Sequence, residues 1–230
     1  MDRPASNPFS TRFTSPGQVD WIGPGDFLEG LCKRWQSLNH RATILGAHGS
    51  GKSTLLEHFV PRVAQVVWRS DALGDVVVDG EPVVGLAIPR REPPRTAATR
   101  RAFWMQLRRA EPQSLAVPWD QLSSDCLLVL DGYEQLSLWR RAMVLLRTKR
   151  IQAGLLVTSH RRTMLPTLCE LSVSLATARA VIERLTAECG GELPIEDTAL
   201  KRRLAERHGN LRDVLMDLYD EVEQRRAGRE

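Results

Sequence analysis

The stretch GAHGSGKST, residues 46–54, restricts the fold of this chain more than any other part of the sequence. Its three glycines leave backbone N–H groups uncovered, so that several of these donors can converge on one anion. Residues 42–45 before it predict a short buried strand, and residues 53–59 predict a helix. A glycine-rich loop between a strand and a helix N-terminus predicts an anion-binding turn in an α/β domain.

The side chains of this loop suit a nucleoside triphosphate and a magnesium ion. Lys52 places a positive charge for the β and γ phosphates, Ser53 offers a hydroxyl to Mg²⁺, and Thr54 is expected nearer the α phosphate. The pattern is that of the P-loop, which predicts binding of ATP, with GTP as an alternative because the loop contacts only phosphates. The residues expected to contact the nucleotide here are Gly46, Ala47, His48, Gly49, Ser50, Gly51, Lys52, Ser53 and Thr54.

An acidic residue follows a second apolar run. Residues 126–130, CLLVL, predict a strand covered on both faces in a parallel sheet, and Asp131 comes directly after them. We expect Asp131 to hold a magnesium-bound water opposite Ser53, with a turn-forming role as the alternative. Glu134 is the nearest candidate for orienting an attacking water, and the alternative is a solvated acid at a helix start.

The run LLVLDGYEQL, residues 127–136, resembles the second nucleotide motif of the signalling ATPases called STAND or NACHT proteins. Those proteins carry a small residue after the first aspartate and acids three and four places on. Glu134 matches the first of these acids, whereas Gln135 departs from the second. In the broader class of P-loop ATPases with an added strand between loop and acid, a glutamate commonly follows the aspartate. Gly132 stands there in this chain.

Residues 155–161, LLVTSHR, resemble the sensor strand of the same family, which usually ends in Thr-Ser-Arg. Thr158 and Ser159 match this ending and are expected near the nucleotide. His160 takes the arginine position, and Arg161 follows it as a candidate for stabilising charge in the transition state.

Residues 208–219, HGNLRDVLMDLY, are similar to the lid helix of the wider AAA+ group, whose Gly-Asn-x-Arg start places a sensing arginine over the nucleotide. Asn210 is then the expected N-cap and Arg212 the sensing residue, while an ordinary capped helix with a surface arginine is the alternative. The resemblance covers residues 41–225 and implies an AAA+ or STAND-type ATPase module. Closing of its lid would convert the nucleotide state into a change of the surface offered to a protein partner or another copy.

Alternating strands and helices predict a doubly wound α/β domain with a mainly parallel sheet, a P-loop NTPase domain, at residues 27–175. We expect a proline-rich extended arm at residues 1–26 and a small helical lid at residues 176–230. Further expected strands are 63–68, a hairpin of 76–79 with 83–88, and 154–157. The expected helices are 27–38 with Asp26 as N-cap, 96–110, 136–150, 176–188, 197–207 and 211–225.

Seven arginines and one acid lie between residues 90 and 109. An arginine-rich segment can bind nucleic-acid phosphates, and a solvated helix face is the alternative. A second hypothesis is therefore a nucleotide-binding adaptor with little turnover that contacts nucleic acid or a protein through this segment. A small-molecule kinase is a third hypothesis. The arginines are Arg90, Arg91, Arg95, Arg100, Arg101, Arg108 and Arg109.

The composition bears on the cellular compartment of this chain. No apolar run approaches the roughly 20 residues needed to span a bilayer, and the start lacks the apolar stretch of a secretory signal. The four cysteines are scattered without metal-ligand spacing, which predicts reduced thiols. We therefore expect a cytoplasmic protein without a membrane span.

Overall fold

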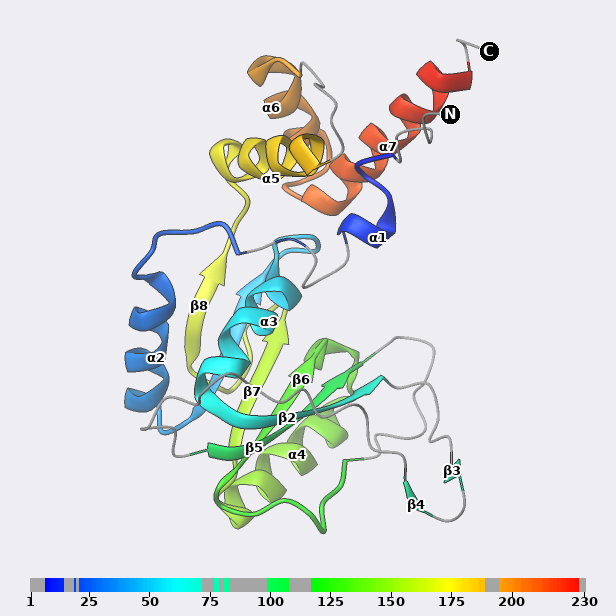
Figure 1. The fold of residues 1–230 in the computed structure, drawn as a ribbon. Helices are drawn as coiled ribbons and strands as arrows, with labels where there is room; N and C mark the ends of the chain where they lie inside the picture. The colour runs from blue at the N-terminus through cyan, green and yellow to red at the C-terminus, as the bar shows by residue number, and fades with distance from the viewer. Residues whose placement is uncertain are drawn as a thin grey trace. The chain divides into compact units, whose positions relative to one another are not determined.

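The computed structural model describes residues 7–14, 19, 21–71, 77–78, 81–82, 99–107, 117–188 and 195–227. The chain is an α/β protein that divides into two compact units (Figure 1). The first, called the sheet unit, comprises Asp26–Leu45 and His58–Glu170. The second, called the helical unit, comprises Met1–Gly25, Gly46–Glu57 and Leu171–Glu230. The division into an arm, an α/β domain and a lid at the boundaries given above stays a prediction.

The main sheet has six strands, of which five run parallel to their neighbours. The strand order is β2 (Ala64–Asp71), β5 (Thr99–Gln106), β6 (Cys126–Asp131), β7 (Gly154–Ser159), β1 (Arg41–Gly46) and β8 (Thr167–Leu171). Leu45 of β1 is opposite Ser159 of β7, and Leu130 of β6 is opposite Val157 of β7. The carboxyl ends of these three strands therefore meet at one edge of the sheet.

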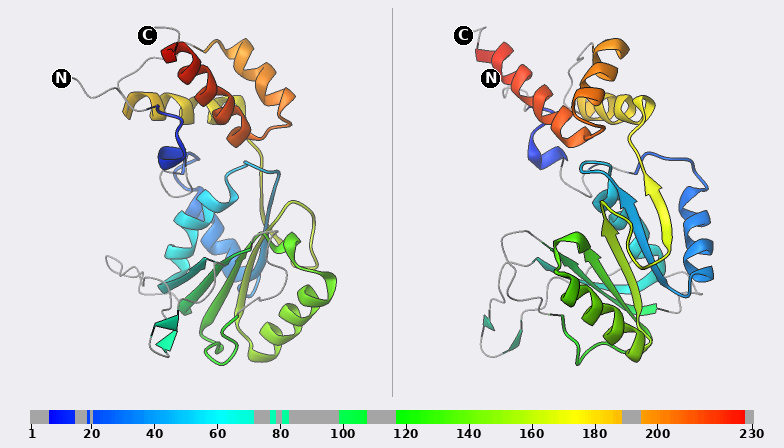
Figure 2. Two further views of the ribbon diagram at one scale, coloured as in Figure 1. Left: turned by 90° about the vertical axis from the view of Figure 1, so that its right-hand side faces the viewer. Right: turned by 180° about the vertical axis from the view of Figure 1, so that it is seen from behind.

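Helices cover both faces of this sheet. α4 (Leu138–Ile151) lies on one face, and the part of α3 (Lys52–Val63) that belongs to the sheet unit lies on the other (Figure 2). On the α4 side, Leu128 and Leu130 pack in one buried cluster with Val144. Val129, between them on β6, is also buried and faces the opposite side, because side chains alternate along a strand. Burial on both faces explains the continuous apolar runs of β6 and β7.

α2 (Phe27–Ser37) follows the predicted helix closely. It packs beside α3 through Trp35 and Phe59, whose rings meet edge to face with their centroids 6.1 Å apart. Asp26 takes the predicted N-cap position, but its side chain does not cap the helix. The backbone of Asp26 already has helical angles, φ −90° and ψ −7°, and its carboxylate makes no capping hydrogen bond.

The prediction of a helix at residues 96–110 is also wrong, because β5 occupies part of this range and pairs in parallel with β2 and β6. Phe103, Trp104 and Met105 are consecutive and all buried. A strand covered on both faces allows this pattern, whereas a helix with one buried side does not. The arginine-rich helix is thus replaced by a strand that contains Arg100 and Arg101, while Arg90, Arg91, Arg95, Arg108 and Arg109 fall outside the described residues.

β8 was not predicted, whereas α4 differs from its prediction only at its ends. α4 begins at Leu138 because Ser137 caps it, with Ser137 Oγ accepting a hydrogen bond from the Arg140 N–H. The short 3-10 helix η1 (Tyr133–Gln135) precedes this cap. Part of the first arm of the expected hairpin forms an antiparallel pair, but its partner strand precedes the predicted second arm, whose residues 83–88 lie outside the described residues. The two paired strands are β3 (Val77–Val78) and β4 (Glu81–Pro82).

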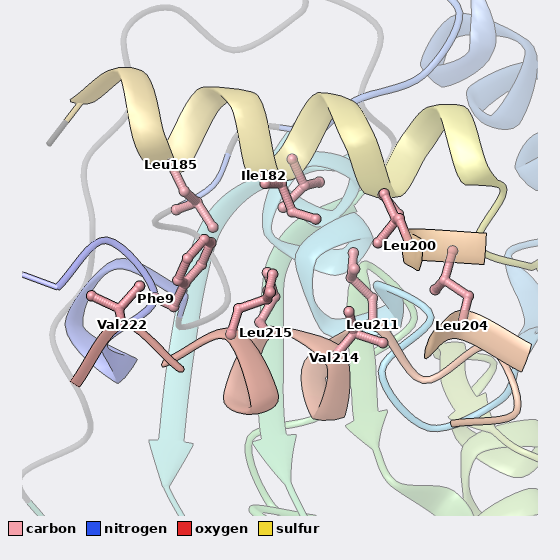
Figure 3. Close-up of a cluster of buried hydrophobic side chains, with 12 residues drawn as sticks. Phe9, Ile182, Leu185, Leu200, Leu204, Leu211, Val214, Leu215 and Val222 are labelled. Carbon is pink, nitrogen blue, oxygen red and sulfur yellow. The ribbon is translucent and has the colours of Figure 1, made fainter. Parts of the chain in front are cut away.

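The helical unit contains three helices that agree with the predicted C-terminal helices. They are α5 (Leu175–Glu188), α6 (Asp197–Glu206) and α7 (Leu211–Ala227). Their apolar sides form one buried core (Figure 3). Among the described residues, no helix has both the length and the apolar composition required to cross a bilayer.

The N-terminal segment before the short α1 (Thr11–Thr14) is part of this core. Phe9 is fully buried, and its ring points toward Leu185, Leu215 and Val222 (Figure 3). Asn7 holds the segment further by donating hydrogen bonds from Nδ2. The acceptors are the carbonyl oxygen of Tyr219 at 3.0 Å and Oε1 of Glu223 at 2.7 Å.

Cys169 on β8 is a half-buried thiol that resists ionisation. Burial raises the pKa of the Cys169 thiol to about 12, and the Arg34 guanidinium opposes this shift only in part. The folded protein therefore keeps a proton that the unfolded chain releases at lower pH. The contribution of this pKa shift to the free energy of unfolding is fully present at neutral pH. It is lost as the pH rises toward the raised pKa.

We expect iodoacetamide at pH 8 to alkylate Cys169 about 1000-fold more slowly in the folded protein than in the urea-unfolded chain. The reason is the smaller thiolate fraction that follows from the raised pKa. Mass spectrometry of the peptide that contains Cys169 measures both rates. Similar rates in the two states would contradict the raised pKa.

Candidate functional site

The glycine loop follows β1 and continues into α3, which confirms the predicted order of strand, loop and helix. Gly49 and Gly51 have positive φ angles of 67° and 87°, a conformation that residues with a Cβ rarely adopt. A Cβ at Gly46 would lie 2.9 Å from the carbonyl oxygen of Leu171. The shape of this loop therefore depends on all three glycines.

Lys52, the first residue of α3, turns back over the loop. Its Nζ donates hydrogen bonds to the carbonyl oxygens of Gly46 and Ala47, both at 2.7 Å, and its side chain is buried. Ser50 is also buried, and its Oγ has no hydrogen-bond partner among the described residues. A buried ammonium group and a buried hydroxyl with an unmet hydrogen bond suit phosphate oxygens, so this loop fits the predicted ligand.

The other predicted loop residues differ in their exposure. Ala47 and His48 are exposed. Ser53 and Thr54 lie in the first turn of α3 and are half-buried. The hydroxyls of these two residues therefore stand at the helix N-terminus, where anions are stabilised.

The start of α7 lies against this loop within the helical unit. A Cβ at Gly49 would overlap the side chain of Asn210 and would lie 2.9 Å from the backbone nitrogen of Arg212. Asn210 Oδ1 also accepts a hydrogen bond from the Asp213 N–H at 3.4 Å, which confirms the predicted N-cap. The N-terminus of a second helix is thus close to the loop. The Arg212 side chain is exposed, and its sensing role stays a prediction.

In the sheet unit, a threonine of β7 orients Asp131 at the end of β6. Thr158 Oγ1 donates a hydrogen bond to Asp131 Oδ1 at 2.6 Å and accepts one from the Gly132 N–H at 2.8 Å. Both Asp131 and Thr158 are buried. Such a hydrogen bond fixes the orientation of a carboxylate, as metal-binding carboxylates require. Ser159 is buried next to them in β7, and its Oγ accepts a hydrogen bond from the Arg161 N–H at 3.1 Å.

Glu134 lies in η1, where its side chain meets His160. His160 Nε2 is 2.8 Å from Glu134 Oε1, and both side chains are mostly buried. Glu134 Oε2 is buried and has no hydrogen-bond partner among the described residues. Arg141 holds the backbone here by donating to the carbonyl oxygen of Glu134 at 2.7 Å. In the sequence, His160 stands out only as a departure from the family pattern, and no local signal predicts this pairing.

Gly132 occupies a position where a side chain does not fit. Its φ angle is 91°, and a Cβ would lie 2.9 Å from the carbonyl oxygen of Leu107. Any other residue would strain the backbone and push against the end of β5. An acid that acts beside Asp131 must therefore come from further along the chain, and Glu134 is the nearest one.

Replacing Gly132 by alanine is expected to lower the free energy of unfolding of the sheet unit by about 2–3 kcal/mol. Gly30→Ala is the matched control, because Gly30 lies in α2 and nothing comes within 4 Å of a Cβ there. This control should raise stability by about 0.5–1 kcal/mol. Urea denaturation followed by circular dichroism measures both changes. Equal stability of the two variants would contradict the steric explanation.

The structure brings the predicted site residues together in two sets. In the helical unit, Lys52 and the other loop residues lie with the start of α7. In the sheet unit, Asp131 and Glu134 lie at the sheet edge with their partners Thr158 and His160. Among the described residues, no group of three or more His, Cys, Asp or Glu could hold a metal ion.

Comparisons with known proteins do not place this chain in a family. No protein-family model matches it, and no curated protein matches it either.

Proposed function

We propose that this chain is an ATP-binding P-loop module of the AAA+ or STAND type, which hydrolyses ATP with Mg²⁺ and changes conformation with the nucleotide state. The order of strands in the sheet is the observation that carries this proposal. β7 lies between β1, which leads into the glycine loop, and β6, which ends at Asp131. An added strand between the loop and the acid is the feature of the ATPase class that the sequence resembles.

The loop would bind the phosphates of the nucleotide. Its backbone N–H groups would donate hydrogen bonds to phosphate oxygens, as at other helix N-termini. Lys52 would exchange the carbonyl oxygens of Gly46 and Ala47 for the β and γ phosphates. Ser53 and Asp131 would hold Mg²⁺ directly or through water. When bound, Mg-ATP supplies a γ-phosphoryl group whose charge the metal partly neutralises.

Glu134 would orient the attacking water. Its Oε2, buried and without a hydrogen-bond partner among the described residues, can accept a hydrogen bond from water while His160 holds Oε1. Arg161 and Arg212 have exposed side chains and are the cations proposed to stabilise charge on the γ phosphate. Thr158 would act through Asp131, because it fixes the orientation of that carboxylate.

Calorimetry with Mg-ATP and a phosphate-release assay test this proposal. Glu134→Gln should slow turnover at least about tenfold, because the amide cannot accept a proton, and should change the affinity for Mg-ATP less than about threefold. Glu183→Gln is the matched control, since Glu183 is an exposed acid on α5. Turnover equal to that of the unaltered protein in the Glu134 variant would remove the proposed role of this residue. No heat of association with Mg-ATP or Mg-GTP would refute the proposed function.

The adaptor with little turnover is the second candidate function. Gly132 favours it, because the residue directly after Asp131 offers no carboxylate. The ion-pair contact between Glu134 and His160 also favours it, because it engages one oxygen of the carboxylate. Tight binding of ATP without phosphate release, in both the unaltered protein and the Glu134 variant, would select the adaptor. Binding to DNA or RNA that weakens as salt is added would then identify phosphate contacts.

A further inference from the structure

α4 carries large apolar side chains on the side that faces away from the sheet. Leu138, Trp139 and Leu146 are 80%, 79% and 68% exposed, although side chains of this kind are usually buried. The inward side of the same helix buries Val144 and Thr148. Trp139 and Leu146 are two helical turns apart, so they lie in one outward line along the helix.

The loop after β7 extends this exposed apolar surface. Met164 is 91% exposed, and its neighbour Leu165 packs against the buried cluster that contains Val144. This loop therefore runs on the α4 side of the sheet. Of the five large apolar side chains that are exposed among the described residues, four belong to this side. Such a concentration marks an interaction surface.

The same surface is strongly basic. α4 contains five arginine and lysine residues and no acid, and residues 161–164 add two exposed arginines and no acid. Arg147, Lys149 and Arg150 are exposed, whereas Arg141 turns inward to the backbone of η1. We call the outward side of α4 together with residues 161–164 the α4 surface. The positive charge of this surface favours an anionic partner.

We infer that the α4 surface binds an anionic lipid membrane. Tryptophan and leucine side chains that protrude from a helix can insert into the interfacial region of a bilayer, where their apolar surface is removed from water. The basic side chains beside them gain from anionic headgroups. A second copy of the chain, docked α4 surface to α4 surface, would bring like charges together, which opposes such a dimer. Nothing in this inference depends on nucleotide binding.

Flotation of the full chain with lipid vesicles tests this inference. We expect binding to phosphatidylcholine vesicles that contain roughly one third phosphatidylserine, no binding to phosphatidylcholine alone, and release at about 1 M salt. Trp139→Ala combined with Leu146→Ala should weaken binding at least about tenfold. Lys149→Glu combined with Arg150→Glu should have a similar effect. All four side chains are exposed, so these variants keep the fold, as circular dichroism can verify.

Matched variants in the helical unit serve as controls. Met216→Ala removes an exposed apolar side chain of α7, and Lys201→Glu combined with Arg202→Glu reverses two exposed charges of α6. Both should bind vesicles as the unaltered chain does. The inference is overturned if the chain does not bind anionic vesicles, or if the α4 variants bind them unchanged. It is also overturned if sedimentation velocity shows a dimer that the Trp139 and Leu146 substitutions dissociate, without any vesicle binding, because the partner is then a second copy.

Discussion

Replacing Lys52 by alanine is expected to weaken the binding of Mg-ATP at least about 100-fold, because charge-assisted hydrogen bonds to the β and γ phosphates are lost. The ammonium group is already held inside the loop by the carbonyl oxygens of Gly46 and Ala47, so little ordering of the side chain remains for binding. Isothermal titration calorimetry measures the change in affinity directly.

Lys33→Ala is the control for this prediction, because Lys33 is an exposed lysine on α2. Its substitution should leave the affinity unchanged. Thermal unfolding of the Lys52 variant must also be recorded, since two loop carbonyl oxygens lose their hydrogen-bond donor. A Lys52 variant that is folded and binds Mg-ATP like the unaltered protein would show that this loop does not hold phosphates.

Replacing Phe9 by alanine is expected to reduce the free energy of unfolding of the helical unit by about 3–5 kcal/mol. The ring is fully buried beside side chains of α5 and α7, so its removal leaves a cavity and releases the anchor of the N-terminal segment. Urea denaturation measures the loss of stability. Limited proteolysis should show faster cleavage of this segment, because its remaining hydrogen bonds come mainly from Asn7.

Phe13→Ala is the matched control for the Phe9 prediction. Phe13 packs against the same core but is only partly buried, and the guanidinium group of Arg12 lies 4.6 Å from its ring centroid. Its substitution should cost about 1 kcal/mol, in the range of ordinary point mutations. Equal losses in the two variants would show that Phe9 does not anchor the segment.

The elements that the sequence predicted well have strong local signals. β6 and β7 are short apolar runs that end in polar residues, and their burial on both faces produces such runs. The loop at residues 46–54 requires a strand before it and a helix after it, and both are present. The C-terminal helices carry apolar residues at helical spacing and are broken at Gly209, whose φ of 76° suits glycine.

β5 was not predictable from its pattern of residues. Phe103, Trp104 and Leu107 are spaced as on one side of a helix, and the nearby arginines suggest a polar side. Periodicity alone does not separate a short buried strand from a helix, and here the neighbours β2 and β6 decide the outcome. The segment is a strand because both of its faces are covered.

The hydrogen bonds around the predicted site could not be derived from the sequence either. Thr158 binds Asp131, and His160 contacts Glu134, between segments that are far apart in the chain. Asp131, Glu134 and Thr158 are each recognisable by the motif in which they stand. Their partners follow from the pairing of β6 with β7, which no local pattern records.

The surroundings of Gly49 restrict how this position can change in evolution. A methyl group at position 49 would occupy the space of the amide at position 210. A smaller residue at position 210 would not make room for it, because the backbone nitrogen of Arg212 and the positive φ at position 49 oppose a side chain as well. Glycine should therefore persist at position 49 among descendants of a common ancestor, whatever residue stands at position 210.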